Sequence, residues 1–237
     1  MTPGLATAAW DAVVDWAQRT ELSTATSGVV ESVPVRAGQR VEKGELLLQL
    51  KQRALRARVE QGKAALEHGR QLREEAGLEL ERAEELYART LLADHDLDLA
   101  KIAYAEADAS YQLSRARYQE ALEALNNSEL RAPFTAVVLA RRVEPAQTVV
   151  TQLRVEPMVI LAAADKRLAR FRVSAEELAD FPLDKTLTVE LEGVRHEGRV
   201  TSINLEAVAE NGSFEVEVLF DADSTTLPGS RAKVSLP

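Results

Sequence analysis

The sequence predicts an elongated, multidomain α+β protein: an antiparallel coiled-coil α-hairpin inserted in a β sandwich, plus a small antiparallel β-barrel domain. Three observations predict this fold class. Residues 51–128 keep a helical period and contain no proline. Short β-branched runs separated by glycine turns flank them on both sides. Residues 153–237 alternate strand-like runs with turn signals, a pattern that favours a small barrel.

The composition excludes several classes of function. The chain has 237 residues, 46% of them hydrophobic, and a net charge of −9, which argues against a nucleic-acid partner or an anionic lipid surface. It has no cysteine, so disulfides and thiolate metal sites are excluded. No apolar run reaches the ~18 residues of a membrane-spanning helix, and no signal peptide opens the chain. If the protein works outside the cytoplasm, we expect its export or anchor segment to be absent from this chain.

The first 50 residues are predicted to be β-rich after a disordered start at residues 1–7. Tryptophans and valines between residues 8 and 26 predict one or two strands. We assign these strands to the barrel, because the chain must enter and leave the sandwich on the same side. Residues 27–50 alternate β-branched runs with glycine turns, and we interpret them as three or four strands that form half of the sandwich.

Residues 51–128 carry the clearest pattern. Apolar or small residues recur in the second half with alternating spacings of three and four, the a/d seam of a coiled coil, and the first half has a matching seam. The pattern predicts a turn centred near Thr90 and an arm of roughly 50 Å, at a rise of about 1.5 Å per residue. Such an arm must project, so we expect its tip to be a contact surface. Two core helices of an ordinary bundle are the alternative.

The two seams fit each other when the helices run antiparallel. Glycine inside a helix costs about 1 kcal/mol, and we interpret Gly62 and Gly69 as making room for tyrosine rings. Arg73 opposite Ala107 is the poorest layer, and its head group is expected to snorkel outward. The predicted register pairs a large side chain with a small one in nearly every layer: Gly62 with Tyr118, Gly69 with Tyr111 and Ala76 with Tyr104.

The strand pattern resumes after the hairpin. Residues 143–149 repeat the Val-x-x-small-Gln-x-Val pattern of residues 35–41, so residues 129–152 are predicted to form the second half of the sandwich. Residues 153–237 are assigned to the barrel, with a capping box at residues 174–177 that opens a short helix. The barrel strands are expected at residues 186–192, 196–205, 214–220 and 232–236, with turns at Asn211-Gly212 and Pro228-Gly229.

Few residues carry chemistry. The histidines His68, His95 and His196 lack metal-ligand spacing. The acidic residues around His95, of which Asp94 is expected to cap the second helix, lack the central glycine and distal glutamate of a calcium loop. We find no nucleophile elbow, phosphate loop or dinucleotide fingerprint. The sequence therefore predicts no catalytic, cofactor or metal site, and a protein that is not an enzyme.

These stretches together resemble the periplasmic adaptor, or membrane fusion protein, family of tripartite efflux and type I secretion systems. Residues 28–47 resemble its first lipoyl half-motif and residues 130–138 its second. Residues 193–203 and 227–230 resemble its β-barrel. The resemblance covers about residues 10–237 in the family's order. It implies a lipoyl-like sandwich without a lipoyl cofactor, because the hairpin occupies the place of the lipoylated Asp-Lys turn.

The resemblance also implies a function. Such adaptors link an inner-membrane transporter, of the resistance-nodulation-division or ATP-binding cassette type, to an outer-membrane channel across the Gram-negative envelope. They serve drug efflux, metal efflux or protein secretion, often as rings of six copies. We therefore expect a periplasmic, inner-membrane-associated and hexameric adaptor. A lipoyl or biotinyl carrier domain with a helical insertion, or a periplasmic metal-binding accessory protein, are the alternatives. The first needs a modifiable lysine at a turn, and the second needs clustered methionine or histidine.

The sequence departs from the family pattern in two places, at the hairpin tip and in the second lipoyl half-motif. Channel-recruiting members carry an arginine, a leucine four residues later and a serine seven beyond that. Here Arg82 and Leu86 match, Ala93 stands at the serine position, and with Arg89 they form the expected docking tip. The alternative is that Leu86 only flanks the seam and Arg82 is a solvated charge. Ala136 and Ala146 replace glycines, a mild change if their φ angles are negative.

Overall fold

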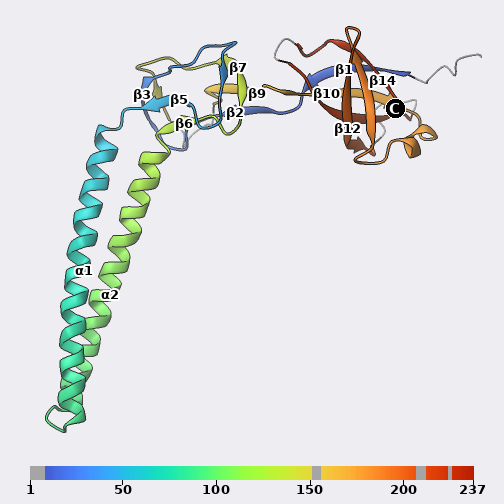
Figure 1. The fold of residues 1–237 in the computed structure, drawn as a ribbon. Coiled ribbons are helices and arrows are strands. Elements are labelled where there is room, and N and C mark those ends of the chain that lie inside the picture. The colour runs from blue at the N-terminus through green and yellow to red at the C-terminus, as the bar shows by residue number, and fades with distance from the viewer. Residues whose placement is uncertain (1–8, 151–155, 207–211, 224–225) are drawn as a thin grey trace, which may run out of the picture.

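The computed structural model describes residues 9–150, 156–206, 212–223 and 226–237 as an elongated molecule of three parts (Figure 1). A long helical arm projects from a β-sandwich, and a β-barrel lies beside the sandwich, so that the arm and the barrel extend from it in different directions. The chain runs from the barrel through the sandwich into the arm and returns by the same route. The predicted fold class is confirmed. The disordered start expected at residues 1–7 lies outside the described residues.

The arm is an antiparallel pair of helices, α1 (Arg53–Ala88) and α2 (Asp94–Asn126). The turn between them contains Thr90, as the seam pattern predicts. In the two helices only Val59, Gly69 and Leu97 are buried, so most of the surface of the arm is open to solvent. The alternative of two core helices in an ordinary bundle is therefore wrong. Neither helix is apolar enough over a sufficient length to cross a membrane.

The sandwich consists of two four-stranded sheets that enclose an apolar core with Leu47, Leu48, Val138 and Leu161 at its centre. Both sheets are built from antiparallel strands. The sheets pack face to face, so one face of each strand lies against this core. The first sheet has the order β2 (Arg19–Leu22), β9 (Val159–Ala163), β7 (Ala136–Arg141) and β4 (Arg40–Val41). The second has the order β6 (Glu129–Arg131), β5 (Leu46–Leu50), β3 (Gly28–Ser32) and β8 (Thr148–Val149).

The boundary between sandwich and barrel differs from the predicted one. Strands β2 and β9 lie within residues 8–26 and 153–237, which we expected to belong to the barrel, but they pair with each other and β9 pairs with β7 in the sandwich. Residues 159–162 are all buried. A strand covered on both faces has no alternation of apolar and polar residues, and its sequence does not indicate which sheet it joins.

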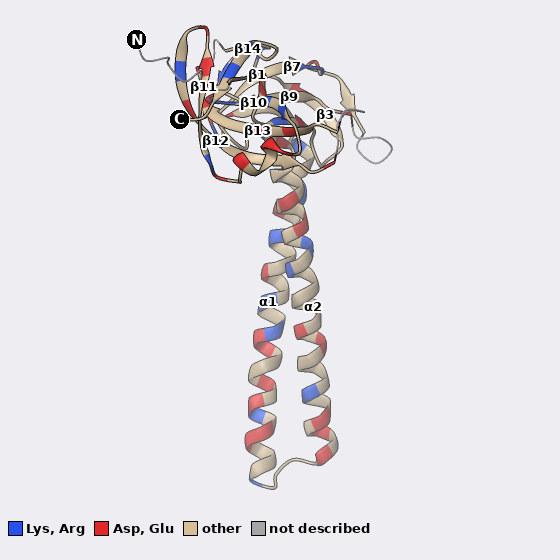
Figure 2. Cartoon of the chain, turned by 90° about the vertical axis from the view of Figure 1, so that its right-hand side faces the viewer, with Lys and Arg blue, Asp and Glu red and all other residues tan. Residues whose placement is uncertain are grey.

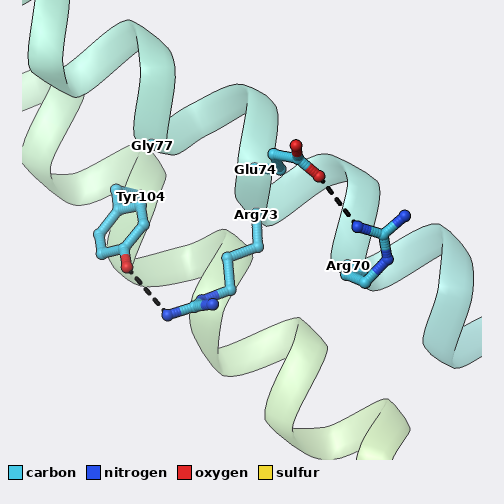
Figure 3. A pocket seen from close by; sticks show the side chains of 5 residues that line it. All are labelled: Arg70, Arg73, Glu74, Gly77 and Tyr104. Carbon is cyan, nitrogen blue, oxygen red and sulfur yellow. Dashed lines mark hydrogen bonds and ion pairs between the residues drawn. The ribbon is translucent and has the colours of Figure 1, made fainter.

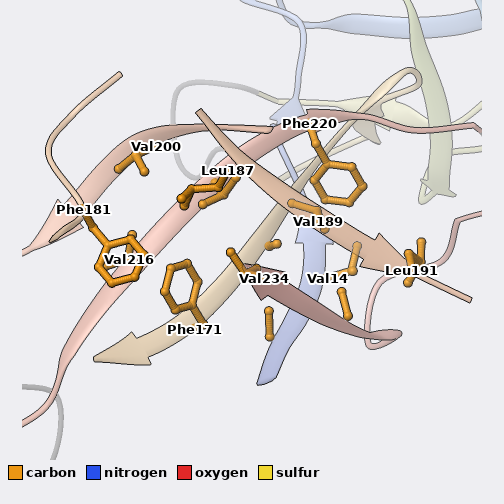
Figure 4. Close-up of a cluster of buried hydrophobic side chains, with 14 of the residues drawn as sticks. Val14, Phe171, Phe181, Leu187, Val189, Leu191, Val200, Val216, Phe220 and Val234 are labelled. Atoms are coloured by element: carbon orange, nitrogen blue, oxygen red, sulfur yellow. The ribbon is translucent and has the colours of Figure 1, made fainter. Parts of the chain in front are cut away.

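The barrel is closed by strands that pack around phenylalanine and valine side chains (Figure 4). Phe181 lies edge-on to Trp10 and Phe171, with ring centroids 4.9 and 5.2 Å apart. The capping box forms, since Ser174 and Glu177 exchange hydrogen bonds, and the short helix that it opens is a 3-10 helix (Glu177–Asp180). The strand order is β1 (Ala9–Trp16), β10 (Lys166–Val173), β13 (Phe214–Asp221), β12 (Val194–Asn204), β11 (Thr186–Leu191) and β14 (Arg231–Ser235).

The internal repeat corresponds to two equivalent turns at residues 36–39 and 144–147. In each turn the glutamine side chain accepts a hydrogen bond from the backbone N–H three residues earlier, at 3.1 Å for both Gln39 and Gln147. Each turn is fastened to the opposite half of the sandwich. The Gly38 N–H donates to the Val138 carbonyl at 2.8 Å, and the Ala146 N–H donates to the Val30 carbonyl at 2.9 Å. The two halves therefore hold each other's turns.

The third residue of each turn, Gly38 or Ala146, adopts a left-handed backbone conformation, which was not expected for Ala146. Gly38 has φ 84° and Ala146 has φ 69°. The expectation that alanine is a mild change holds at Ala136, whose φ is not positive, and is wrong at Ala146. An L-residue in this region brings its Cβ too close to the following carbonyl oxygen, which costs about 1–2 kcal/mol.

We predict that Ala146→Gly raises the free energy of unfolding by about 0.5–1 kcal/mol, because relief of the strain exceeds the added entropy of the unfolded chain. Gly38→Ala is the matched control. A Cβ at Gly38 meets nothing within 4 Å, so the expected loss of about 1 kcal/mol is due to the backbone alone. Urea unfolding of both variants measures the effects, and a loss of stability in Ala146→Gly contradicts the prediction.

Candidate functional site

The candidate site is the helical arm, beginning with the seam that holds it together. A Cβ added at Gly62 would lie 3.1 Å from the Cα of Tyr118, and one at Gly69 would lie 3.2 Å from the Cα of Tyr111. The structure thus brings together the expected pairs. The reason differs from the expected one, because the glycines give room to the backbone of the opposite helix more than to the tyrosine ring. Small residues at such positions permit helix axes to approach closely.

The third tyrosine packs against a glycine that the sequence interpretation missed. A Cβ at Gly77 would lie 3.4 Å from Cε2 of the Tyr104 ring, whereas the predicted partner was its neighbour Ala76. The signal was present in the sequence. Gly77 follows Gly69 by eight residues, one more than a heptad, so it falls beside the a/d seam and was not counted in it.

Arg73 bonds across the interface to the opposite helix, while 41% of its side chain stays exposed to solvent. Its Nε donates to the Asp108 carboxylate, and its Nη2 donates to the Tyr104 hydroxyl at 3.1 Å (Figure 3). Its guanidinium carbon also lies 5.5 Å from the centroid of the Tyr111 ring, within cation–π range. The hydrogen bond to Asp108 raises the pKa of Arg73. Arg73 therefore links the two helices in one register.

A pocket beside Arg73 is lined by Arg70, Glu74, Gly77 and Tyr104 (Figure 3). Arg70 is already paired with Glu67 at 2.8 Å and with Glu74 at 3.0 Å. The pocket results from the missing side chain of Gly77. Because its charged groups satisfy one another, it is a feature of helix packing and not a ligand site.

The root of the arm is fixed by a buried polar network. The Gln52 side-chain amide donates to the Ser128 hydroxyl at 3.0 Å and to the Glu129 carboxylate at 2.9 Å. Arg56 donates to the oxygen of the same amide at 2.7 Å. The hydrogen bond from Gln52, followed by that from Arg131, lowers the pKa of Glu129. Gln52 precedes α1 and Ser128 follows α2, so the network ties the two ends of the arm to each other and to the sandwich.

The tip turn is built on Thr90 in the left-handed region, with φ 59°. The Thr90 N–H donates to the Tyr87 carbonyl at 2.8 Å, and the Leu91 N–H donates to the Leu86 carbonyl at 3.0 Å. These two bonds form a Schellman motif, which usually has glycine at the left-handed position. The turn presents Leu91, with 70% of its surface exposed. Sequence reasoning missed Leu91, because a leucine in an apolar stretch beside a seam is read as core.

The four residues expected at the docking tip are distributed over the last turns of α1 and the start of α2. Arg82 pairs with Glu79 of its own helix at 2.9 Å and is largely exposed, and Leu86 is 41% exposed. Arg89 follows α1 as its C-cap, and Ala93 is the N-cap of α2. The cap at Ala93 makes no side-chain hydrogen bond. Asp94, which we expected to be the cap, lies instead in the first helical turn.

The distal part of the arm is acidic (Figure 2). The Asp94 carboxylate accepts a hydrogen bond from the Tyr87 hydroxyl across the two helices, and this bond raises the pKa of Tyr87. Among the described residues, no three His, Asp or Glu side chains gather in a metal-binding arrangement. The acidic side chains are Glu74, Glu75, Glu79, Glu81, Glu84 and Glu85 on α1 and Asp94, Asp96 and Asp98 on α2.

The seam geometry predicts unequal effects on stability for two glycine replacements. Gly77→Ala is expected to raise the free energy of unfolding by up to about 1 kcal/mol, the difference in helix propensity, because the contact at 3.4 Å is only with a ring edge. Gly62→Ala should gain less or lose stability, since its 3.1 Å contact is with backbone. Thermal unfolding of both variants measures this difference. Equal gains would contradict a close approach of the backbones.

Ala93→Ser is predicted to stabilise the arm. A serine hydroxyl at the N-cap accepts a hydrogen bond from a free N–H of the first turn, which is worth about 0.5–2 kcal/mol. Amide hydrogen exchange at the start of α2 would slow as a result. Ala93→Val, which adds a side chain without an acceptor, is the control. If both variants change exchange equally, the N-cap assignment is wrong.

The comparisons with known proteins agree with this architecture. Residues 18–156 match the family model described as CzcB-like, barrel-sandwich hybrid domain. The cation efflux system protein CzcB of Alcaligenes sp. (strain CT14) is 29% identical over 157 residues, which are 64% of this chain and 29% of that protein. The nodulation protein NolF of Rhizobium meliloti (strain 1021) is 30% identical over 132 residues, 56% of this chain and 36% of NolF. The chain thus spans only about a third of the length of these relatives.

Solved structures share the fold. The membrane fusion protein Spr0693 from Streptococcus pneumoniae R6 has a TM-score of 0.71 at 12% identity, covering 98% of this chain and 99% of that chain. A MacA-MexA chimeric protein with the Pseudomonas aeruginosa MexA α-hairpin domain has a TM-score of 0.69 at 15% identity, covering 98% and 79%. Both likenesses cover 98% of this chain and so extend over barrel, sandwich and arm. The chain therefore belongs to the family of the CzcB-like barrel-sandwich hybrid domain, and it shares the fold of solved membrane fusion proteins.

Proposed function

We propose that the protein is a periplasmic adaptor that links an inner-membrane transporter to an outer-membrane channel for efflux or export. The observation that carries this proposal is the arm, two helices of 36 and 33 residues fixed at the root and open to solvent along their length. At about 1.5 Å per residue, α1 reaches roughly 50 Å from the sandwich. A contact made at its tip therefore joins partners that lie far apart.

The tip supplies the contact surface for the channel. Leu86 and Leu91 expose apolar surface within an acidic surrounding, and an apolar centre with a polar rim is typical of docking surfaces between proteins. Arg82 and Arg89 flank this centre as positive charges. In this proposal the arm acts as a strut, and the tip packs helix against helix on the channel.

The remaining partners are proposed from the family. The relative CzcB is named for cation efflux, and the chimeric neighbour combines MacA with MexA. We infer that the transporter is of the resistance-nodulation-division or ATP-binding cassette type and that six copies assemble around it, with the protein associated with the inner membrane. The proposed role is mechanical linkage and needs no catalytic group.

Leu86→Asp is expected to abolish docking on the channel while the fold stays intact, because an aspartate buried in an apolar helix contact loses its hydration without gaining a partner. Co-purification of the channel from cells and export of the cargo measure the effect. Leu78→Asp is the matched control, since Leu78 lies on α1 away from the tip and is 52% exposed. If cells with Leu86→Asp still transport, or if both variants fail alike, the tip is not the docking surface.

A further inference from the structure

The barrel and the sandwich are joined by a two-stranded ribbon. Strand β1 of the barrel continues into β2 of the sandwich, and β9 of the sandwich continues into β10 of the barrel. β1 pairs with β10, and β2 pairs with β9. The barrel part of the ribbon ends at the pair Trp16 and Arg167. Residues 17–18 and 164–165 therefore form the joint between the two domains.

Arg167 bonds to both sides of this joint. Its Nε donates to the carbonyl of Thr226, in the segment between β13 and β14 of the barrel, at 2.9 Å. Its Nη1 donates at 3.0 Å to the carbonyl of Ala163, the last residue of β9, and at 3.2 Å to that of Ala164 in the joint. Its guanidinium carbon lies 4.1 Å from the centroid of the Trp16 ring. One side chain thus fastens the end of a sandwich strand to the barrel.

The burial of this arginine is costly. Its relative exposure is 0%, and burial lowers its pKa. All the oxygens to which it donates are backbone carbonyls. Its Nη2 has no hydrogen-bond partner in the described part of the chain. A buried, charged side chain costs more than an apolar one of similar volume, so its presence here calls for a role that an apolar side chain cannot fill.

The joint itself is held from both domains. On the sandwich side, Arg40 forms a two-fold ion pair with Asp165, and the Ala164 N–H donates to the Thr135 carbonyl at 3.2 Å. On the barrel side, the Ala222 N–H donates to the Asp165 carbonyl at 3.1 Å. The ion pair is about half exposed, so solvent and salt screen it more than they screen the contacts of a buried side chain. The buried Arg167 is therefore the main candidate for fixing the joint.

We propose that Arg167 is a positioning residue that locks the angle between barrel and sandwich, so that the two domains move as one rigid body. Hydrogen bonds depend on direction, whereas apolar contacts tolerate sliding. An apolar residue at this position would fill the space and leave the angle free. This inference does not depend on the proposed function, because it concerns a joint within this chain.

The absence of native cysteine permits a direct test with two spin labels, at Lys43→Cys in an exposed sandwich turn and Arg195→Cys in the barrel. Double electron–electron resonance on the parent is expected to give one narrow distance distribution. Arg167→Met should roughly double its width, as expected when a rigid joint becomes a hinge. Arg167→Lys should also broaden it, because lysine lacks the planar fork that bonds several carbonyls.

Arg170→Met is the matched control, because Arg170 lies on the same strand and pairs only within the barrel, with Asp15 and Glu217 at 2.8 Å. It should leave the distribution narrow. A folded Arg167→Met protein with a narrow distribution overturns the proposal, as does equal broadening in Arg170→Met. If Arg167→Met does not fold, Arg167→Lys decides, since it keeps the positive charge and most of the side-chain length but lacks the planar fork that bonds several carbonyls. Broadening then supports the lock, and an unchanged width refutes it.

Discussion

The chain passes through the barrel and the sandwich on its way to the arm and must pass through both again on its way back. The arrangement of the three parts depends on this path. The barrel is built from β1 and from β10–β14, and the sandwich strands and the arm lie between these two segments in the sequence. The sandwich is built from β2–β5 and β6–β9, and the arm lies between them. The outgoing and returning segments therefore pair at each boundary, as Arg19 does with Ala162 between sandwich strands and Leu50 does with Ser128 at the root of the arm. Only the arm is made of one continuous stretch.

Three of the five buried polar side chains among the described residues lie at the boundaries between the parts. The cores of sandwich and barrel consist of apolar side chains, which stabilise without fixing direction. Gln52 and Ser128 are buried at the root of the arm, and Arg167 is buried at the joint with the barrel. A buried hydrogen bond is expensive to break, so these groups favour one relative orientation of the parts. This arrangement suits a protein whose action depends on where its tip points.

Within the arm, stiffness and register come from different contacts. The glycines let the helix backbones approach, and the tyrosines opposite them fill the seam. The apolar part of this packing is not directional. Arg73, which bonds to Asp108 and Tyr104 of the opposite helix, contributes a directional link that a shift would break. The acidic side chains of the distal part give the arm a negative surface, which repels other anionic surfaces.

The sequence by itself determined the order of the domains, the helical arm and its register. Periods of 3.5 and 2 residues depend on neighbours along the chain, and so does the position of a turn such as Thr90. It also indicated Leu86 and Arg82 at the tip through the resemblance. What it could not determine were features set by contacts between distant segments. These include the assignment of β2 and β9 to the sandwich and the left-handed φ of Ala146.

Only the tertiary structure decided which polar residues are buried and what they bond. The seam pattern places Arg73 between the helices but does not indicate its partners, and nothing in the sequence around Arg167 distinguishes it from a solvated charge. One is held by residues 31 and 35 positions away along the chain, and the other bonds a carbonyl 59 positions away. Such contacts depend on how closed sheets and paired helices bring remote segments together. The local pattern of a sequence therefore defines the elements, whereas the directional contacts that orient them appear only once the chain is folded.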